Sequence, residues 1–308
     1  LMGVSEALYI PAGLSLITDY HQEKTRSLAV GIHMTGLYLG QALGGFGATV
    51  ASRYGWEQAF FTFGLIGIGY ALVLILFLHD KKNEQQPFRA TVAQPLQEHP
   101  VRGAIKGLGV IFNTFAFWII LLYFTTPSLP GWATKNWLPT LFSENLSLDM
   151  AQAGPLSTIT IALASFCGVI IGGVLSDKWV QRNVRGRVYT GAIGLALTIP
   201  ALLLLGFGSN LLMILGGGLC FGLGFGIFDA NNMPILCQFI SPRYRATAYG
   251  LLNMTGVFAG AAITDFLGRS TDAGNLGHDF AMLAGVVLVA LVIQLIFLRP
   301  KVDNKLDD

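Results

Sequence analysis

Long apolar runs alternate with short polar segments along most of the chain. A helix needs about 20 mainly apolar residues to cross the hydrocarbon core of a bilayer. Nine runs are long enough, and we predict a membrane-spanning helix in each: residues 1–19, 25–52, 57–78, 110–142, 151–176, 188–207, 211–240, 246–268 and 278–298. The pattern therefore predicts an all-α, multi-pass membrane protein.

The fourth run is too long for a single straight span. Pro127 and Pro130 lie within it and each removes a backbone N–H donor, so we expect a broken or strongly kinked helix there. Irregular backbone at membrane depth is tolerated where it faces protein or a wet cavity, and broken helices often mark transporter binding sites. Four polar side chains near the prolines are therefore candidate cavity residues: Tyr123, Thr126, Lys135 and Asn136.

Lys135 and two nearby tryptophans each have two interpretations. A cavity-facing Lys135 would attract an anionic solute, but a lysine near the end of a span also commonly extends its ammonium group to the lipid headgroups. Trp132 and Trp137 are more typical of anchors at the membrane interface than of side chains that stack on a solute.

Composition supports a membrane protein and argues against several functions. Of the 308 residues, 53% are hydrophobic and 12% are charged, with a mean hydropathy of +0.60, whereas soluble domains carry roughly 25% charged residues. The net charge of +2, without a basic, aromatic-rich patch, gives no indication of a nucleic-acid partner. The three cysteines lack metal-ligand spacing, and the sequence has no phosphate-binding loop, zinc-protease or serine-hydrolase motif. We therefore expect no enzymatic activity, no metal site and no cofactor.

The distribution of basic residues predicts the orientation. If the loop at 20–26 faces the cytoplasm and the nine spans alternate, 16 of the 19 Lys and Arg residues lie on the cytoplasmic side. Cytoplasmic loops of membrane proteins carry this excess of positive charge. We therefore expect the polar segment at 80–109 and the C-terminus to be cytoplasmic, in an integral protein of the cytoplasmic (plasma) membrane.

Parts of the first two spans recur six spans later. Residues 3–11 and 226–234 both have the pattern Gly-x-x-acid-Ala-x-x-x-Pro, and residues 26–31 and 245–250 share Arg-x-x-Ala-x-Gly. Small residues that let helices pack closely could explain the glycines, but they do not explain the paired acids. Parallel repeats of this kind occur in transporters built from two similar halves.

The repeat predicts the domain organisation. If span one corresponds to span seven, each half has six helices, and three helices of the first half would precede Leu1. We therefore expect a partial N-terminal bundle of three helices at 1–79, a cytoplasmic linker at 80–109, a C-terminal six-helix bundle at 110–299 and a cytoplasmic tail at 300–308.

A basic loop between the fifth and sixth predicted spans points to a family. Gly173, Asp177, Lys178, Gly186 and Arg187 resemble the signature loop of the major facilitator superfamily. The loop is a few residues longer than the usual form, and a generic basic loop on the cytoplasmic side is the alternative.

Residues 3–26 also resemble the fourth helix of two families within this superfamily. These are the spinster-like lipid transporters and the anion:cation symporters of sugar acids and organic anions. The resemblance implies two pseudo-symmetric helix bundles and secondary active transport by alternating access. Both families carry a glutamate implicated in coupling at the position of Glu6, and the resemblance implies the same role here.

Two acidic residues occupy matching positions of the repeat, deep in their spans. Glu6 lies ~20 Å from Asp19 by helical rise, near the middle of a ~30 Å core, where a charge is costly. It is either a coupling site that takes up and releases a proton or cation, or a structural acid bonded to a neighbouring helix. Its repeat partner Asp229, which Asn231 and Asn232 follow, either faces the cavity or belongs to a row of polar side chains that seals helices together.

The second span contributes further polar candidates. His33 could titrate near neutral pH, but its repeat partner is Asn253, so hydrogen bonding to the solute is favoured over proton relay, and packing is the alternative. His33 is expected to share a helix face with four residues: Gly36, Leu37, Gly40 and Gln41. Of these, Gln41 joins His33 and Asn253 in the predicted substrate cavity.

Matching arginines begin the second and eighth spans. Arg26 and Arg245 are expected either to pair across the cytoplasmic side, with Asp19 and Asp177 as partners, or to act as topology anchors. Pairing would hold an outward-open state. The predicted gate and signature loop comprise seven residues: Asp19, Arg26, Gly173, Asp177, Lys178, Arg187 and Arg245.

Together these features predict secondary active transport of a small anionic or amphiphilic organic solute, coupled to a proton or cation. The expected partners are the solute, the coupling ion and the lipid bilayer, with no nucleic acid. Efflux of lipids or drugs by the same fold is one alternative, and a truncated product or sensor that binds solute without moving it is another. An intramembrane enzyme has no motif to support it.

Overall fold

The computed structural model describes residues 2–22, 24–44, 54–77, 108–109 and 111–299, without the side chains of residues 2–8, 59 and 151. Its described elements are ten α-helices and one short 3-10 helix, and no strand occurs among these residues. The prediction of an all-α chain is thereby confirmed. By compactness the chain divides into two units, residues 1–45 with 111–308, and residues 46–110.

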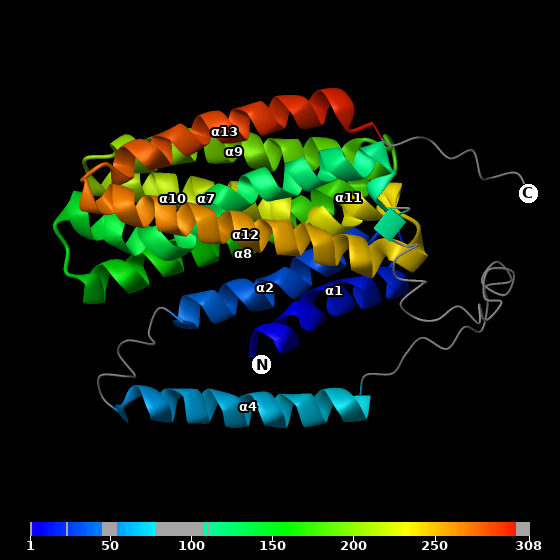
Figure 1. Cartoon of the computed structure of the whole chain (residues 1–308), viewed down its shortest axis with the longest axis horizontal. Helices are drawn as coiled ribbons and strands as arrows, with labels where there is room; N and C mark the ends of the chain where they lie inside the picture. The colour runs from blue at the N-terminus through cyan, green and yellow to red at the C-terminus, as the bar shows by residue number, and fades with distance from the viewer. Residues whose placement is uncertain (1, 23, 45–53, 78–107, 110, 300–308) are drawn as a thin grey trace, which may run out of the picture. The chain divides into compact units, whose positions relative to one another are not determined.

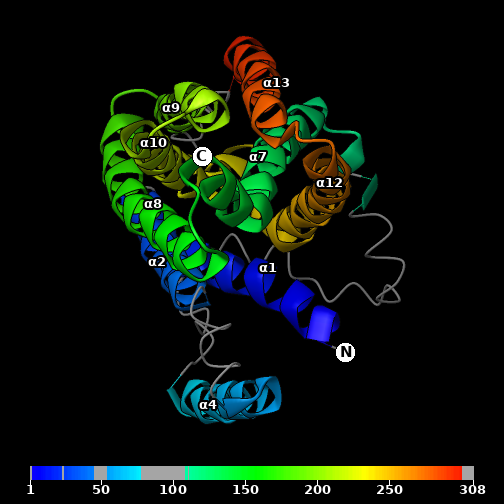
Figure 2. The same cartoon turned by 90° about the vertical axis from the view of Figure 1, so that its left-hand side faces the viewer.

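The first unit is a bundle of long helices (Figures 1 and 2). Its elements are α1 (Met2–Tyr20), α2 (Arg26–Gly44), α7 (Phe115–Leu146), α8 (Met150–Val180), α9 (Gly186–Phe207), α10 (Leu211–Asp229), α11 (Asn232–Phe239), η1 (Pro242–Tyr244), α12 (Arg245–Asp272) and α13 (Leu276–Phe297). Helix α10 packs between α8 and α9, α13 lies on α9 and α7, and α12 lies along α7. Helix α2 packs on α8 and α1 on α12, so the N-terminal helices contact the C-terminal ones.

Glycines let α2 and α8 approach each other closely. A Cβ atom on Gly31 would lie 2.6 Å from the Val169 carbonyl oxygen, and one on Gly173 would lie 2.7 Å from the Leu28 Cα. Neither space accepts a side chain without moving a backbone. Small residues at helix contacts are typical of membrane proteins, and here they bring Gly173 of the predicted signature loop against the start of α2.

Seven segments of the described residues are long and apolar enough to cross a membrane: Trp56–Phe77, Phe115–Leu146, Gln152–Val180, Gly186–Phe207, Leu211–Phe239, Pro242–Asp272 and Leu276–Phe297. They coincide with the last seven predicted spans. The first two predicted spans are also helical, as α1 and α2 of 19 residues each. Helices α2 and α12 begin at Arg26 and Arg245, the matching arginines of the repeat.

Of the two predicted forms of the fourth span, the broken helix is wrong, because α7 is one continuous helix of 32 residues that contains Pro127, Pro130 and Pro139. The strong kink stays a prediction. Packing along α12 holds α7 together. Thr125 donates from Oγ1 to Thr255 Oγ1 at 3.1 Å, and about two turns beyond Pro130 the Trp137 Nε1–H donates to the Thr264 carbonyl at 3.2 Å. Neighbouring helices and hydroxyl groups commonly make prolines tolerable inside membrane helices.

The break lies instead between α10 and α11, at Ala230 and Asn231. The Asn231 side-chain amide donates to the Ile227 carbonyl at 2.8 Å, and the Asn231 backbone N–H turns to the Phe228 carbonyl at 3.0 Å. The Asn231 side-chain amide thus takes the place of its own backbone N–H as the donor to the Ile227 carbonyl, in the i to i−4 hydrogen-bond series of the helix. Pro234 has no N–H to donate to the Ala230 carbonyl, so two residues cooperate to interrupt the helix directly after Asp229.

The second unit contains α4 (Trp56–Phe77), which coincides with the third predicted span. Its single charged residue is Glu57, in the first turn, and Gly55 precedes it with a φ of +82°. Its other residues are almost all apolar, as expected of a membrane-spanning helix. The predicted linker, apart from residues 108–109, and the predicted tail at 300–308 lie outside the described residues.

Candidate solute-binding site

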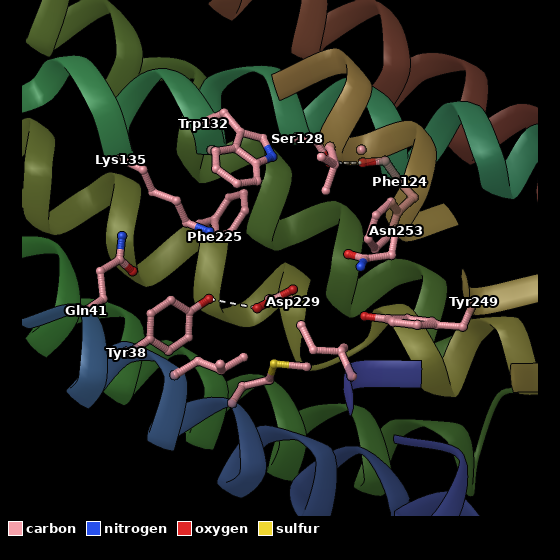
Figure 3. A pocket seen from close by; sticks show the side chains of 16 residues that line it. Tyr38, Gln41, Phe124, Ser128, Trp132, Lys135, Phe225, Asp229, Tyr249 and Asn253 are labelled. Atoms are coloured by element: carbon pink, nitrogen blue, oxygen red, sulfur yellow. Dashed lines mark hydrogen bonds between the residues drawn. The ribbon is translucent and has the colours of Figure 1, made fainter. Parts of the chain in front are cut away.

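A cavity of about 150 Å³ opens inside the first unit, between helices α1, α2, α7, α10 and α12 (Figure 3). Sixteen residues line it: Ile10, Met34, Leu37, Tyr38, Gln41, Phe124, Ser128, Gly131, Trp132, Lys135, Phe225, Asp229, Tyr249, Asn253, Gly256 and Val257. The N-terminal helices α1 and α2 therefore share one cavity with α7, α10 and α12.

The helix break presents the Asp229 carboxylate to this cavity. Tyr38 of α2 donates from its hydroxyl group to Oδ2 at 2.9 Å, and the Asn232 amide donates to Oδ1 at 3.0 Å. Both carboxylate oxygens therefore accept a hydrogen bond, as a charge at this depth requires. The Tyr38 bond also connects α2 to the end of α10, and Figure 3 shows it at the centre of the lining.

Lys135 of α7 is the cation of the described lining. Its ammonium nitrogen lies 4.9 Å from the centre of the Trp132 ring. Its charge also acts electrostatically on the Asp229 carboxylate. The cavity thus holds one acidic and one basic side chain, on separate helices. Lys135 therefore contributes to the cavity lining, as one of its two predicted interpretations requires, and its role in solute binding stays a prediction.

Aromatic rings form much of the wall. The rings of Phe124 and Tyr249 meet edge to face, with centroids 5.8 Å apart, and Phe225 stacks on Phe221 at 5.6 Å. Trp132 lines the cavity too, the position that a side chain stacking on a solute would need, and its assignment as an interface anchor stays a prediction. Phe124, Phe225 and Tyr249 are absent from the predicted cavity residues, because aromatic side chains inside an apolar run give no signal of their own.

Four of the predicted cavity or coupling residues come together in this lining: Gln41, Lys135, Asp229 and Asn253. A fifth, Asn232, is buried beside it and holds Asp229. The face predicted on α2 is displaced by part of a turn. The residues that reach the cavity are Met34, Leu37, Tyr38 and Gln41, which follow the i, i+3, i+4, i+7 spacing of one helix face.

Five predicted cavity residues lie elsewhere in the described part of the chain. His33 lies between α1 and α2, with its ring centre 6.0 Å from that of Tyr9. Tyr123 is buried against Phe228, with ring centres 5.0 Å apart. Thr126 is buried. Asn136 is exposed and donates to Thr264 Oγ1 at 2.8 Å. Asn231 lies at the helix break, where its amide donates to the Ile227 carbonyl.

The remaining predicted coupling residue, Glu6, lies in α1, and its side chain is outside the described residues. Its role stays a prediction.

A second polar cluster, which we call the α2–α8 clasp, consists of Ser27, Ser176, Asp177 and Arg187. Asp177 accepts hydrogen bonds from the backbone N–H groups of Ser27 at 3.0 Å and of Leu28 at 2.9 Å. It also forms a fully buried ion pair with Arg187, whose Nη2 lies 3.3 Å from Oδ1. Asp177 therefore caps the start of α2, where the helix dipole favours a negative charge.

The clasp differs from the predicted pairing, in which Asp177 was a partner of Arg26 or Arg245. Arg26 donates instead to the Thr18 carbonyl at 3.4 Å, and Arg245 donates to the Ile240 and Cys237 carbonyls at 3.2 Å. Lys178 is exposed at the end of α8. The prediction that Asp19 pairs across this side stays open.

Comparison with known proteins identifies the family to which the chain belongs. A model of the Major Facilitator Superfamily matches residues 1–264. The chain belongs to this superfamily. The prediction of a facilitator-type, multi-pass membrane protein is thereby confirmed.

Curated relatives of this superfamily member include a probable chloroplastic anion transporter of Arabidopsis thaliana, 29% identical over 94% of this chain and 59% of the relative. A chloroplastic ascorbate transporter of the same plant is 22% identical over 96% of this chain and 56% of the relative. A chloroplastic sodium-dependent phosphate transport protein, also from Arabidopsis, is 24% identical over 96% and 59%. The chain thus spans less than three-fifths of the length of these relatives.

Among solved structures, the chain is similar to a bacterial homologue of the human lysosomal transporter Spinster, in an inward-facing, unoccupied conformation. The identity is 19% and the TM-score 0.52, with 92% of this chain and 71% of the other covered. At this identity the likeness shows the fold alone.

Proposed function

We propose that the protein moves a small organic anion across a membrane by secondary active transport. The observation that carries this proposal is the cavity between α1, α2, α7, α10 and α12, whose lining includes both Lys135 and Asp229. A cation in the lining of a cavity attracts an anionic solute. The relatives that are named as anion, ascorbate and phosphate transporters support the same class of solute.

In this proposal, transport proceeds by alternating access. The cavity is shared between the N-terminal helices α1 and α2 and the C-terminal helices α7, α10 and α12. If the two sets of helices rock against each other, the cavity opens to one side of the membrane and then to the other. Solute binding then shifts the population between the two states.

Asp229 is our candidate for coupling, together with Glu6. The Asp229 carboxylate accepts a hydrogen bond from Tyr38, which lies on the opposite set of helices. Protonation of Asp229 would remove the charge that this bond and the Lys135 ammonium group stabilise. A proton could therefore change the energy of the state in which α2 and α10 are joined. A cation is the alternative coupling ion, and one relative is named as sodium-dependent.

The distribution of basic residues supports a topology with the segment at 80–109 and the C-terminus in the cytoplasm. We assign no catalytic reaction to the cavity. A sensor that binds without transport is the second candidate function, and flux measurements separate the two.

The test is anion flux into proteoliposomes that contain the complete gene product. Benzoate, gluconate, ascorbate and inorganic phosphate are the probes. For the transported probe, Lys135→Gln should reduce uptake about tenfold or more, since it removes the cation of the described lining. Arg269→Gln is the matched control, because Arg269 is an exposed residue paired with Asp265. It should leave uptake within twofold of wild type.

Two outcomes would contradict the proposal. Binding of a probe without any flux would favour the sensor. Equal uptake by the Lys135→Gln and Arg269→Gln variants would remove Lys135 from the site.

A further inference from the structure

The cavity lining is richer in aromatic rings than anion binding alone requires. Five rings face it from four helices: Tyr38 of α2, Phe124 and Trp132 of α7, Phe225 of α10 and Tyr249 of α12. The charged and amide side chains of the described lining number four: Gln41, Lys135, Asp229 and Asn253. A sugar acid or a phosphate ion would need many hydrogen-bond partners, whereas this lining offers mostly apolar faces.

Several lining polar groups are already engaged within the protein. The Tyr38 hydroxyl group donates to Asp229, and the Ser128 hydroxyl group donates to the Phe124 carbonyl at 2.8 Å. A polyhydroxylated solute would leave most of its hydroxyl groups facing rings, without partners, and each unpartnered polar group costs free energy.

Three of the rings pack against glycines of neighbouring helices. The Phe124 ring lies against Gly256, where an added Cβ would be 3.0 Å from its Cε1. The Phe225 ring lies against Gly131, where an added Cβ would be 2.9 Å from its Cζ. The Trp132 ring lies closer still to Gly260. A side chain larger than glycine at these positions would displace a ring, so the glycines make room for the aromatic wall, and a wall of packed rings suits a rigid, flat body.

The polar groups of the lining are separated along the cavity. In Figure 3 the side chains of Lys135 and Gln41 lie on one side of Asp229, and those of Asn253 and Tyr249 lie on the other. A solute with a carboxylate at the Lys135 end would place the body of the molecule among the rings. The cavity of about 150 Å³ is smaller than the roughly 300–1,000 Å³ pockets of drug-sized ligands, so it suits a single ring.

We propose that the solute is a single-ring aromatic carboxylate. Its carboxylate group interacts with Lys135 and Gln41, and its ring packs against Trp132, Phe225 and Tyr249. This inference rests on the proposed function and narrows its substrate class. Aromatic pairs prefer offset or edge-to-face contacts and gain from them beyond the burial of area.

The experiment compares two acids that differ in their π face. Benzoate and cyclohexanecarboxylate have the same charge and similar size, but only benzoate is aromatic. We expect the complete protein to bind benzoate about three- to tenfold more tightly by titration calorimetry. Trp132→Leu should abolish this preference, Trp132→Phe should largely keep it, and Lys135→Gln should weaken both acids alike.

Trp118→Leu is the matched control, because Trp118 lies on the same helix, is half exposed and does not line the cavity. It should keep the preference. The ratio of the two dissociation constants is measured on one sample, so a variant that folds poorly still reports the preference of its folded fraction.

The outcomes separate the two proposals. Equal binding of the two acids, or tighter binding of gluconate or phosphate, would overturn the aromatic assignment while anion transport stands. Loss of the preference in Trp118→Leu but not in Trp132→Leu would overturn it too. If none of these anions is bound or transported, both the inference and the proposed function fail.

Discussion

At the scale of single residues, the structure separates two interior carboxylates, the buried Asp177 and the half-buried Asp229, by their partners. Asp177 has a guanidinium counterion and two backbone N–H donors, so its charge is fully compensated. Asp229 has only neutral donors, Tyr38 and Asn232, within hydrogen-bonding distance in the described part of the chain. A structural role therefore suits Asp177, and a role that involves gain and loss of charge suits Asp229.

The first prediction concerns Asp229. Asp229→Asn keeps the size of the side chain and an oxygen that accepts from Tyr38, but it cannot take up a proton. Uptake driven by a proton gradient should be lost, while exchange of labelled for unlabelled solute should continue within about threefold of wild type. Asp265→Asn, at an exposed position, should change neither rate. Proton-driven uptake that survives in Asp229→Asn would remove this residue from coupling.

The second prediction concerns Arg187. Arg187→Gln leaves the Asp177 charge buried without its counterion, and breaking a buried pair typically costs about 3–5 kcal/mol. The melting temperature in detergent should fall clearly. Arg269→Gln breaks an exposed pair four residues apart on one helix, with side chains 80% and 65% exposed, where about 0.5 kcal/mol or less is expected. Equal melting temperatures for the two variants would show that the clasp contributes little to stability.

Sequence reasoning at this scale located polar residues better than aromatic ones. A polar side chain inside an apolar run is costly to place in a membrane span, so it signals a functional position. This signal identified four lining residues: Gln41, Lys135, Asp229 and Asn253. Trp132 and Phe225 do not stand out, since the same residue types also face lipid. Their positions depend on how α7 and α10 are rotated about their axes, which no single-helix pattern fixes.

At the scale of helices, the sequence located the spans but misplaced the break. Prolines were the signal for a break, yet α7 contains three of them without interruption. The interruption between α10 and α11 needs Pro234 together with the Asn231 amide bond to Ile227. The repeat also indicates that a proline alone does not interrupt a helix. Pro11 matches Pro234 but lies inside the continuous α1, where no asparagine precedes it.

The third prediction follows from this cooperation. In a variant with both Asn231→Ala and Pro234→Ala, the Ile227 carbonyl loses its side-chain donor and residue 234 regains an N–H. Helix α10 should then continue through residues 230–231, with the residue-234 nitrogen about 2.9 Å from the Ala230 oxygen in a structure of the variant. Transport should fall, since Asp229 would turn relative to Tyr38. A break that persists in this variant would mean that tertiary packing imposes it.

At the scale of the whole molecule, the contact of α2 with α8 bears on the proposed mechanism. Alternating access requires the N-terminal and C-terminal helices to separate on one side of the membrane during each cycle. The clasp joins them through Asp177 and through the Ser27 and Ser176 hydroxyl groups, whose oxygens lie 3.3 Å apart. A covalent bond between these two side chains should therefore stop the cycle.

We predict that a Ser27→Cys, Ser176→Cys variant loses transport after mild oxidation and regains it with a reductant, because the serine side chains are close enough for disulfide geometry. Each single variant, treated alike, controls for the native cysteines at 167, 220 and 237 and should keep its activity. Full transport by a double variant in which the disulfide has demonstrably formed would mean that α2 and α8 stay together throughout the cycle. The rocking would then have to occur between other helices.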